Sequence, residues 1–394
     1  MRIVSGAAVV LVAVLAGVGW FVSTSAQSVQ APYFEVDPLW PKPLPNHWLI
    51  GSTIGVTVDS RDHVWIIHRP GSLVDNELAL KTGKGSCCAA APPVLEFDQA
   101  GTLVGHWGGP GPGYDWPAQN HGITADDKGN LWLGGSGQED SHILKFSREG
   151  KFLLQVGKPH VRKSGENHEG FTWAANSSDP DAFGRVAKVF YDAPANEAYV
   201  ADGYLNHRVA VIDADTGKMK RFWGAYGSKP DDTNLGDYDP KAPGAKSFRN
   251  PVHCVMVSTD RFVYVCDRVN DRLQVFRTDG TFVTEKKLAG DTRGSGSVWD
   301  LAFSRDPQQS FIYIADGTNE KIHILRRQTL EELTTIGDGG RQPGQFFGIH
   351  NIATDSQGNI YTTETYEGKR VQRFLFKGLR AVTRKDQGTP WPNR

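Results

Sequence analysis

Three histidines stand at one position of a sequence repeat, and together they offer the ligand set of a metal centre. They are His121, His253 and His350, and each begins the strand that precedes a tight turn in its copy of the repeat. The three belong to alternate members of a set of six copies. In a six-membered ring, alternate positions form a triangle about the axis, so the imidazoles would converge on one point. Three histidines with an open fourth position are typical of catalytic zinc, whereas structural zinc sites use four protein ligands.

The histidines also allow an interpretation without a metal. A single isolated histidine more often fills a polar gap in a channel than binds a metal. Three in alternating register favour a bound transition metal, with zinc preferred over iron, copper or manganese. The remaining histidines show no comparable register, and we expect His207 and His323 to be solvated strand positions.

The elements that must position these histidines are short strands. Segments that end in an apolar-Tyr-apolar run repeat along the chain, strongly at 199–209, 264–273 and 313–322 and more weakly at 64–69, 131–136 and 360–365. In each copy a strand precedes the motif, a tight turn joins the two, and a further strand follows. Six copies of a four-stranded unit predict an all-β fold, a closed six-bladed β-propeller around a central channel.

The repeat also predicts the limits of the domain. A lone strand over residues 33–36 precedes the first copy and is expected to complete the last blade and close the ring. One propeller domain over residues 33–380 follows, with a C-terminal tail over 381–394. The segments 70–93 and 229–250 lack the repeat and are predicted to be long loops.

Residues 1–26 are predicted to be a signal peptide. Met1 and Arg2 precede a near-continuous apolar run from Ala7 to Val22, and small residues then allow cleavage after Ala26. The apolar run is short for a membrane span, although an uncleaved N-terminal anchor is the alternative. Either way, we expect the domain to work outside the cytoplasm, as a secreted or periplasmic protein.

Charge and composition limit the partners. Lys plus Arg is 43 and Asp plus Glu is 44, so the chain has no net basic charge to attract nucleic acid or an anionic membrane. We therefore expect a small-molecule or peptide substrate, no nucleic acid, no membrane contact apart from the N-terminal anchor, and a monomer. The 44 glycines, 22 prolines and 11 tryptophans suit short strands joined by tight turns.

Four cysteines are present, and their spacing does not resemble a zinc knuckle or a redox Cys-x-x-Cys motif. In an oxidising compartment, Cys254 and Cys266 would pair if their strands form a hairpin. A bridge between the adjacent Cys87 and Cys88 is a second option. Free buried thiols remain the alternative for each pair.

The repeats resemble the NHL type, and the set of motifs is similar to the peptidyl-α-hydroxyglycine α-amidating lyase family. The resemblance spans all six blades. Its local motifs are 64–69 (VWIIHR), 120–123 (NHGI), 202–208 (DGYLNHR), and 263–272 behind 251–253 (PVH). Generic NHL sequence explains the Asp and Asn positions of the repeat, but it does not explain the three histidines together with Arg69 and Tyr204.

The resemblance implies a role for each matched residue. The three histidines would be zinc ligands, Tyr204 the base, and Arg69 and Arg268 the residues that line the substrate pocket. The implied reaction cleaves an α-hydroxyglycine-type carbinolamide to an amide and glyoxylate. The alternatives are an ordinary strand-end aromatic for Tyr204 and a surface ion pair for Arg69.

The family also holds a structural calcium ion near the axis. The resemblance implies ligands at the backbone carbonyls of Val56 and Ile123 and at the residue after the third zinc histidine. That residue is an aspartate in the family and Asn351 here, and the loss of a negative charge should weaken a calcium site. Leu205 stands where the family has a cysteine beside the tyrosine, so that disulfide is missing.

Three functional classes therefore compete. The first is an exported zinc-dependent lyase of the amidating type. The second is another metal-dependent propeller enzyme, such as a lactonase-like hydrolase. Such an enzyme would require carboxylate and asparagine side chains in the channel as calcium ligands. The third is a non-catalytic NHL propeller that binds a ligand or acts as a scaffold, which would not need the histidine register.

Overall fold

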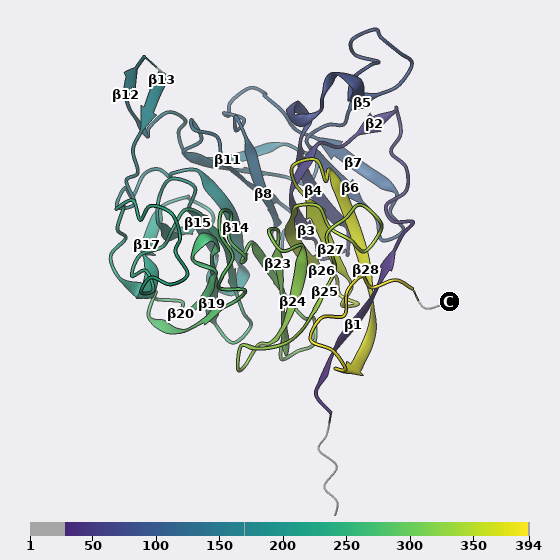
Figure 1. Ribbon diagram of the computed structural model, residues 1–394. Helices are drawn as coiled ribbons and strands as arrows, with labels where there is room; N and C mark the ends of the chain where they lie inside the picture. Colours follow the sequence, from purple (N-terminus) through teal and green to yellow (C-terminus); the bar gives the residue numbers. More distant parts are fainter. Residues whose placement is uncertain (1–27, 169, 393–394) are drawn as a thin grey trace, which may run out of the picture.

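Six antiparallel four-stranded sheets are arranged as blades around a central axis (Figure 1). This computed structural model describes residues 28–168 and 170–392, and the predicted signal peptide 1–26 lies outside the described residues. The sheets confirm the prediction of an all-β, six-bladed β-propeller. Within the two described ranges, no helix has the length and apolar character needed to cross a membrane.

Each blade runs from an inner strand at the axis to an outer strand at the rim. The strands of blades 1 to 3, inner to outer, are β3 (Ser52–Val58), β4 (Val64–Arg69), β6 (Val94–Phe97) and β7 (Leu103–Trp107); β8 (Asn120–Ala125), β9 (Leu131–Gly135), β10 (His142–Phe146) and β11 (Phe152–Gly157); and β14 (Val186–Asp192), β15 (Glu197–Asp202), β16 (Arg208–Asp213) and β17 (Met219–Trp223). Those of blades 4 to 6 are β18 (Val252–Val257), β19 (Phe262–Asp267), β20 (Arg272–Arg277) and β21 (Phe282–Lys287); β22 (Asp300–Phe303), β23 (Phe311–Asp316), β24 (Lys321–Arg326) and β25 (Glu331–Ile336); and β26 (Ile349–Thr354), β27 (Ile360–Glu364), β28 (Arg370–Ala381) and β1 (Gln30–Asp37).

The remaining elements lie in the connections. They are two small sheets, β2 (Trp48–Leu49) with β5 (Ala89–Ala90) and β12 (Lys163–Asn167) with β13 (Gly170–Trp173), and the 3-10 turns η1 (Pro70–Ser72), η2 (Asp75–Glu77), η3 (Ala193–Ala195), η4 (Ala225–Gly227) and η5 (Arg268–Asn270). Both segments predicted to be long loops lie outside the blades. Segment 70–93 holds only η1, η2 and β5, and segment 229–250 holds no helix or strand.

The N-terminal strand closes the ring, as the sequence predicted. Strand β1 contains the expected strand and pairs antiparallel with β28, with Phe34 opposite Phe376 (purple beside yellow in Figure 1). The last blade is therefore built from both ends of the described chain. The paired strands extend from Gln30 to Ala381, slightly beyond the predicted limits of 33–380.

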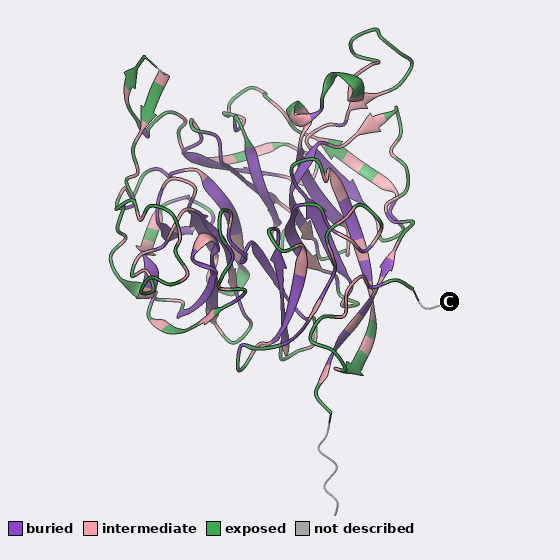
Figure 2. Ribbon diagram, viewed as in Figure 1, coloured by how far each residue is buried: buried purple, intermediate pink, exposed green. Residues whose placement is uncertain are grey.

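The hydrophobic core is divided among the blade interfaces. The described residues contain six clusters of buried apolar side chains, and each cluster draws its members from two neighbouring blades. The inner and middle strands are accordingly buried, while exposed positions gather on outer strands and loops (Figure 2). Since no blade buries both faces alone, each depends on its two neighbours.

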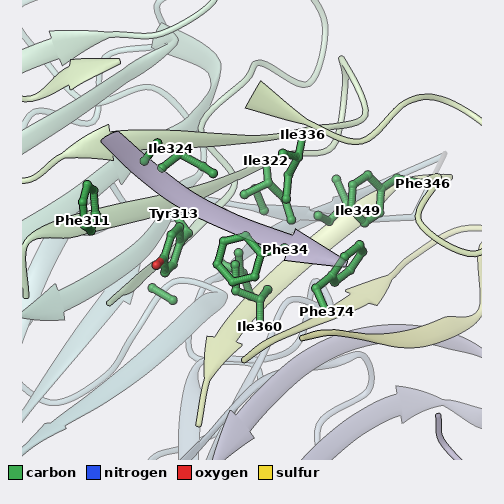
Figure 3. Close-up of a cluster of buried hydrophobic side chains, with 14 of the residues drawn as sticks. Phe34, Phe311, Tyr313, Ile322, Ile324, Ile336, Phe346, Ile349, Ile360 and Phe374 are labelled. Atoms are coloured by element: carbon green, nitrogen blue, oxygen red, sulfur yellow. The ribbon is translucent and has the colours of Figure 1, made fainter. Parts of the chain in front are cut away.

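The cluster between blades 5 and 6 shows how the closing strand is held. Phe34 of β1 is 1% exposed, and its ring centroid lies 5.4 Å from that of Tyr313 in an edge-to-face arrangement (Figure 3). Ile322, Ile349 and Phe374 belong to the same cluster. Such aromatic contacts add to the free energy gained by burying apolar surface.

Aspartates explain the tight turns of the repeat. Asp126 Oδ1 accepts hydrogen bonds from the backbone N–H groups of Lys128 (3.0 Å) and Asn130 (2.8 Å), which closes the turn between β8 and β9. Asp59 and Asp355 make the same pattern in blades 1 and 6. A carboxylate that caps its own turn is a common turn-forming device.

A second set of repeat aspartates is structural as well. Asp202 and Asp267 end the second strands of blades 3 and 4, and both are fully buried. Arg208 Nε donates to Asp202 at 2.8 Å, and Arg272 Nε donates to Asp267 at 2.7 Å. Because these arginines are paired, they are not available to a substrate.

All four cysteines form disulfides. Cys254 and Cys266 face each other across β18 and β19, as the hairpin interpretation predicted. Cys87 and Cys88 form the vicinal bridge in segment 70–93.

The expectation for His207 and His323 was wrong. His207 is 4% exposed and His323 is 5% exposed. His323 lies between two carboxylates, with Nε2 3.0 Å from Asp316 and Nδ1 2.7 Å from Glu332. Both carboxylates come from the neighbouring strands of the blade, β23 and β25, and cover the ring.

Replacing Phe34 with Ala should loosen the closing strand. We expect the free energy of unfolding to fall by about 3–5 kcal/mol, because a fully buried aromatic ring is lost and leaves a cavity. Leu39→Ala is the control, since Leu39 is 85% exposed. Denaturant unfolding should show the loss in the first variant only, and equal stabilities of the two variants would contradict the assignment of β1.

His323 should make stability depend on pH. Burial lowers its pKa, but the hydrogen bonds that the ring donates to Asp316 and Glu332 outweigh burial and raise the pKa to about 9 from 6.5. The charged imidazole therefore stabilises the fold fully below about pH 6.5, and this contribution is lost as the pH rises through 9. His323→Gln should cost most stability near pH 6 and progressively less up to pH 10. A stability difference that is constant over this range, measured by thermal unfolding, would refute the pairing.

Candidate metal centre and active site

The structure brings the three predicted metal ligands together at the axis. His121, His253 and His350 come from blades 2, 4 and 6, and they are 1%, 1% and 3% exposed. Their ring centroids lie 4.8 to 5.2 Å apart. One ligand atom from each lies within 4.8 Å of the other two, a separation at which one ion can contact all three.

Irregular strand pairing turns these side chains toward the axis. The register between β18 and β19 shifts at His253, and the register between β26 and β27 shifts at His350. In blade 2 the shift falls at Gly122, directly after His121, where the backbone has φ +69°. A bulge of this kind re-aims a side chain, and a residue without Cβ tolerates that φ best.

Each histidine is oriented through Nδ1. His121 Nδ1 donates to the carbonyl oxygen of Ala187 at 2.7 Å, and His253 Nδ1 donates to that of Trp299 at 2.5 Å. Ala187 and Trp299 occupy the same repeat position as the histidines, each in the next blade. His350 Nδ1 is 2.5 Å from Asn351 Oδ1. Because these oxygens accept hydrogen bonds, the proton lies on Nδ1 and Nε2 carries the lone pair, as in metal-bound histidines.

Burial keeps the imidazoles neutral. It lowers the pKa of His121 and His253 well below 6.5 and that of His350 to about 3. The positive charge of Arg268 acts in the same direction on His253 and His350. Neutral imidazole is the form that binds a metal, so the donor set fits a zinc ion.

Tyr204 lies directly against the ligand atoms. Its hydroxyl is 3.0 Å from His121 Nε2 and 3.0 Å from His253 Nε2. It comes from the loop after β15, and the ring is half-buried. The predicted base is therefore placed at the centre of the site.

The two predicted arginines flank this tyrosine. Arg268 Nη1 donates to Tyr204 Oη at 3.3 Å, and its guanidinium lies 4.4 Å from the Trp299 ring centroid. Arg268 Nε is buried without a hydrogen-bond partner among the described residues. Arg69 is held by the Asn120 carbonyl at 3.2 Å and Ser136 Oγ at 2.8 Å. Burial lowers the pKa of Arg69.

A third arginine, Arg185, was not predicted. Its Nε donates to the Ser136 carbonyl at 2.8 Å, and its guanidinium lies 5.9 Å from the Tyr204 ring centroid. Within the described part of the chain, Arg69, Arg185 and Arg268 form no ion pair with a carboxylate within 4.0 Å. Arg185 stands two residues before the repeat position of blade 3, and comparison of that column across the six copies would have singled it out.

The residues implied for calcium lie close by on the inner strands. Val56 and Ile123 are buried on the neighbouring strands β3 and β8. The Asn351 side chain is already engaged on both sides, because Oδ1 meets His350 and Nδ2 donates to Asp300 at 2.8 Å.

Known proteins share parts of this sequence. Mouse NHL repeat-containing protein 3 is 23% identical over 317 residues, which cover 78% of this chain and 71% of the relative. Mouse peptidyl-glycine alpha-amidating monooxygenase is 27% identical over 251 residues, and the rat protein is 26% identical over 250. The chain resembles NHL-repeat and amidating proteins. The match covers 61% of this chain but only 22% of each of these two monooxygenases, and no family model matches the sequence.

Solved structures agree on the fold. A streptogramin B lyase superimposes with a TM-score of 0.51 at 12% identity, over 88% of this chain and 98% of the other. At this identity the match supports the propeller architecture alone.

Removing one imidazole should empty the metal centre. We expect His253→Ala to lose about one zinc ion per chain, because two histidines hold zinc far more weakly than three. His142→Ala is the matched control, since His142 is also buried, on β10 away from the axis. Elemental analysis of folded protein measures the effect, and full zinc retention by His253→Ala would place the metal elsewhere.

Proposed function

We propose that this chain is an exported zinc-dependent lyase that cleaves an α-hydroxyglycine-type carbinolamide to an amide and glyoxylate. The observation that carries the proposal is the convergence of three neutral imidazoles at the axis, two of which lie 3.0 Å from the Tyr204 hydroxyl, with Arg268 donating to the same oxygen. A non-catalytic propeller has no need for this arrangement.

The histidines would hold zinc through Nε2. When bound, zinc supplies a Lewis acid that makes a substrate hydroxyl more acidic. As the phenolate, Tyr204 would take the hydroxyl proton, and its contacts of 3.0 Å to two of the proposed ligands place it for this step. As the carbon–oxygen double bond of glyoxylate forms, the carbon–nitrogen bond breaks and the departing amide nitrogen takes up a proton, which Tyr204 can return. Atoms and charge balance without a further reactant.

The arginines would bind the substrate carboxylate. Arg268 carries a buried Nε donor that has no partner among the described residues, and an unpaired buried donor is costly unless a ligand completes it. Arg69 and Arg185 add positive charge around Tyr204. A guanidinium can hold a carboxylate with two parallel hydrogen bonds, so the carboxylate of an α-hydroxyglycine suits this site.

Room for the rest of the substrate lies beside Arg268. A cleft of about 620 Å³ opens there, and Tyr238, Phe248 and Arg293 contribute to its walls. Segment 229–250 forms one of these walls. We propose that the acyl or peptide part of the substrate occupies this cleft.

The similarity to amidating proteins supports the lyase over the other two classes. Export is supported by the two disulfides, since such bonds persist in oxidising compartments. A lactonase-like hydrolase is less well supported, because the channel carboxylate Asp300 is already paired with Lys188. If no turnover is found, a ligand-binding propeller is the alternative, and the similarity to an NHL repeat-containing protein supports it.

Glyoxylate release from a synthetic peptidyl-α-hydroxyglycine by zinc-loaded protein tests the proposal. Tyr204→Phe removes the hydroxyl with little change in volume, so turnover should fall about 10²- to 10⁴-fold, as is typical of general-base loss, with zinc content unchanged.

Tyr191→Phe is the matched control, because it removes a hydroxyl of the same blade, one that bonds Asn196 and lies outside the proposed site. It should keep full activity. Absence of glyoxylate release by the wild type would refute the lyase activity, and equal rates for wild type and Tyr204→Phe would remove the tyrosine from the mechanism.

A further inference from the structure

A buried ion pair crosses the channel directly behind the proposed metal ligands. Lys188 of blade 3 follows Ala187, and Asp300 of blade 5 follows Trp299, so both lie one residue deeper than the histidine level. Lys188 Nζ is 2.6 Å from Asp300 Oδ1. The side chains are 7% and 0% exposed, so the charges are shielded from water.

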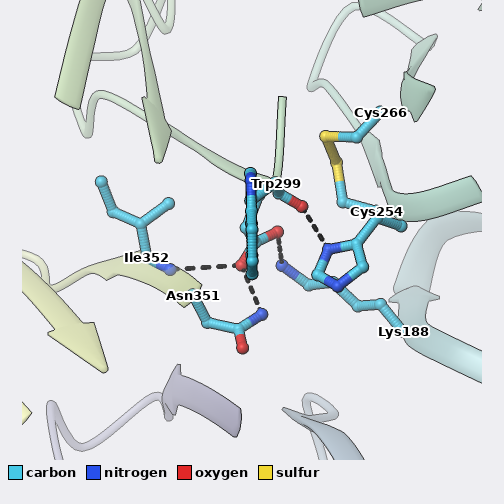
Figure 4. The surroundings of a disulfide bond; sticks show 8 residues. Lys188, Cys254, Cys266, Trp299, Asn351 and Ile352 are labelled. Atoms are coloured by element: carbon cyan, nitrogen blue, oxygen red, sulfur yellow. Dashed lines mark hydrogen bonds and ion pairs between the residues drawn. A yellow bond between two sulfur atoms is a disulfide. The ribbon is translucent and has the colours of Figure 1, made fainter. Parts of the chain in front are cut away.

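Asp300 is connected to a histidine through one amide. Asp300 Oδ2 accepts from Asn351 Nδ2 at 2.8 Å and from the backbone N–H of Ile352 at 3.2 Å (Figure 4). These bonds fix which way the Asn351 amide points. Its Oδ1 is therefore the atom that faces His350 Nδ1, at 2.5 Å.

This arrangement does not fit the calcium ion that the family resemblance implies. Asn351 Oδ1 already accepts a hydrogen bond, and Nδ2 is a donor that cannot ligate a cation. A divalent ion held by Asn351 would also face the ammonium of Lys188, because Asn351 and Lys188 bond to the same Asp300 carboxylate. The positive charge that a calcium ion would provide is thus supplied by a side chain.

We propose that the Lys188 ammonium and the Asp300 carboxylate replace a structural calcium ion in this chain and position His350 through Asn351. The chain of contacts runs from Lys188 to Asp300, from Asp300 to Asn351, and from Asn351 to His350. It keeps the proton on Nδ1 of His350 and leaves Nε2 directed at the metal centre. Groups that orient a ligand in this way typically change metal affinity 10- to 100-fold when they are removed.

The positioning role rests on the proposed metal centre, but the calcium test does not. Adding millimolar calcium chloride to the zinc-loaded wild type should change its melting temperature no more than the same concentration of magnesium chloride does. Saturable calcium binding that raises the melting temperature and disappears in Asn351→Ala would overturn the proposal.

Removing the ammonium should create a need for calcium. Lys188→Ala leaves Asp300 without its counter-charge, so zinc affinity, measured by competition with a chelating dye, should fall about 10- to 100-fold. Calcium should restore both zinc affinity and melting temperature. Lys145→Ala is the matched control, because Lys145 also pairs with a buried aspartate, Asp126 at 3.3 Å, outside this layer. If calcium rescued both variants equally, or if it did not rescue Lys188→Ala, the proposal that the ion pair replaces calcium would be contradicted.

Asn351→Asp keeps the test decisive if Lys188→Ala fails to fold. The new carboxylate would face Asp300 where Nδ2 now donates, so the melting temperature should fall and calcium should not recover it. A calcium-dependent melting temperature above that of wild type would show that this layer is a calcium site. None of these readouts uses lyase activity, so a protein without glyoxylate release still tests the inference.

Discussion

Pairing of β1 with β28 closes the ring, and the geometry of the site depends on this closure. The three histidines come from blades 2, 4 and 6, and no two of them share a sheet. Their separation is therefore set by the interfaces between blades, each of which is held by its own apolar cluster. Two of the imidazoles are oriented by carbonyl oxygens of the next blade. A ring that opened at blade 6 would displace His350 from the other two.

The charged residues fall into two groups with different roles. The repeat aspartates close turns or pair with arginines such as Arg208 and Arg272, and these residues hold the blades together. Around Tyr204, by contrast, Arg69, Arg185 and Arg268 form no ion pair with a carboxylate among the described residues. Leaving positive charge uncompensated in a partly buried site costs stability, and an anionic ligand would offset that cost. The distribution of charge thus favours a carboxylate-bearing substrate.

Much of the fold could be predicted because the repeat is visible along the chain. The blade count, the closing strand and the hairpin that joins Cys254 to Cys266 all follow from local periodicity, and the histidine register follows from the same alignment. Contacts across the channel could not be predicted in this way. Lys188 and Asp300 are 112 residues apart, and nothing in either strand indicates that they meet. The approach of Arg185 to Tyr204 was missed because it depends on a neighbour from another loop of the blade. The burial of His323 was missed although its partners Asp316 and Glu332 lie only 7 and 9 residues away, on the flanking strands of the same blade.

Anomalous diffraction at the zinc absorption edge, from crystals of protein purified without added metal, tests the metal centre most directly. We expect one peak per chain at the axis, about 2.0–2.1 Å from Nε2 of His121, His253 and His350, with the fourth position directed at Tyr204. A peak at other residues, or an empty axis with Tyr204 still bonded to His121 and His253, would contradict this expectation.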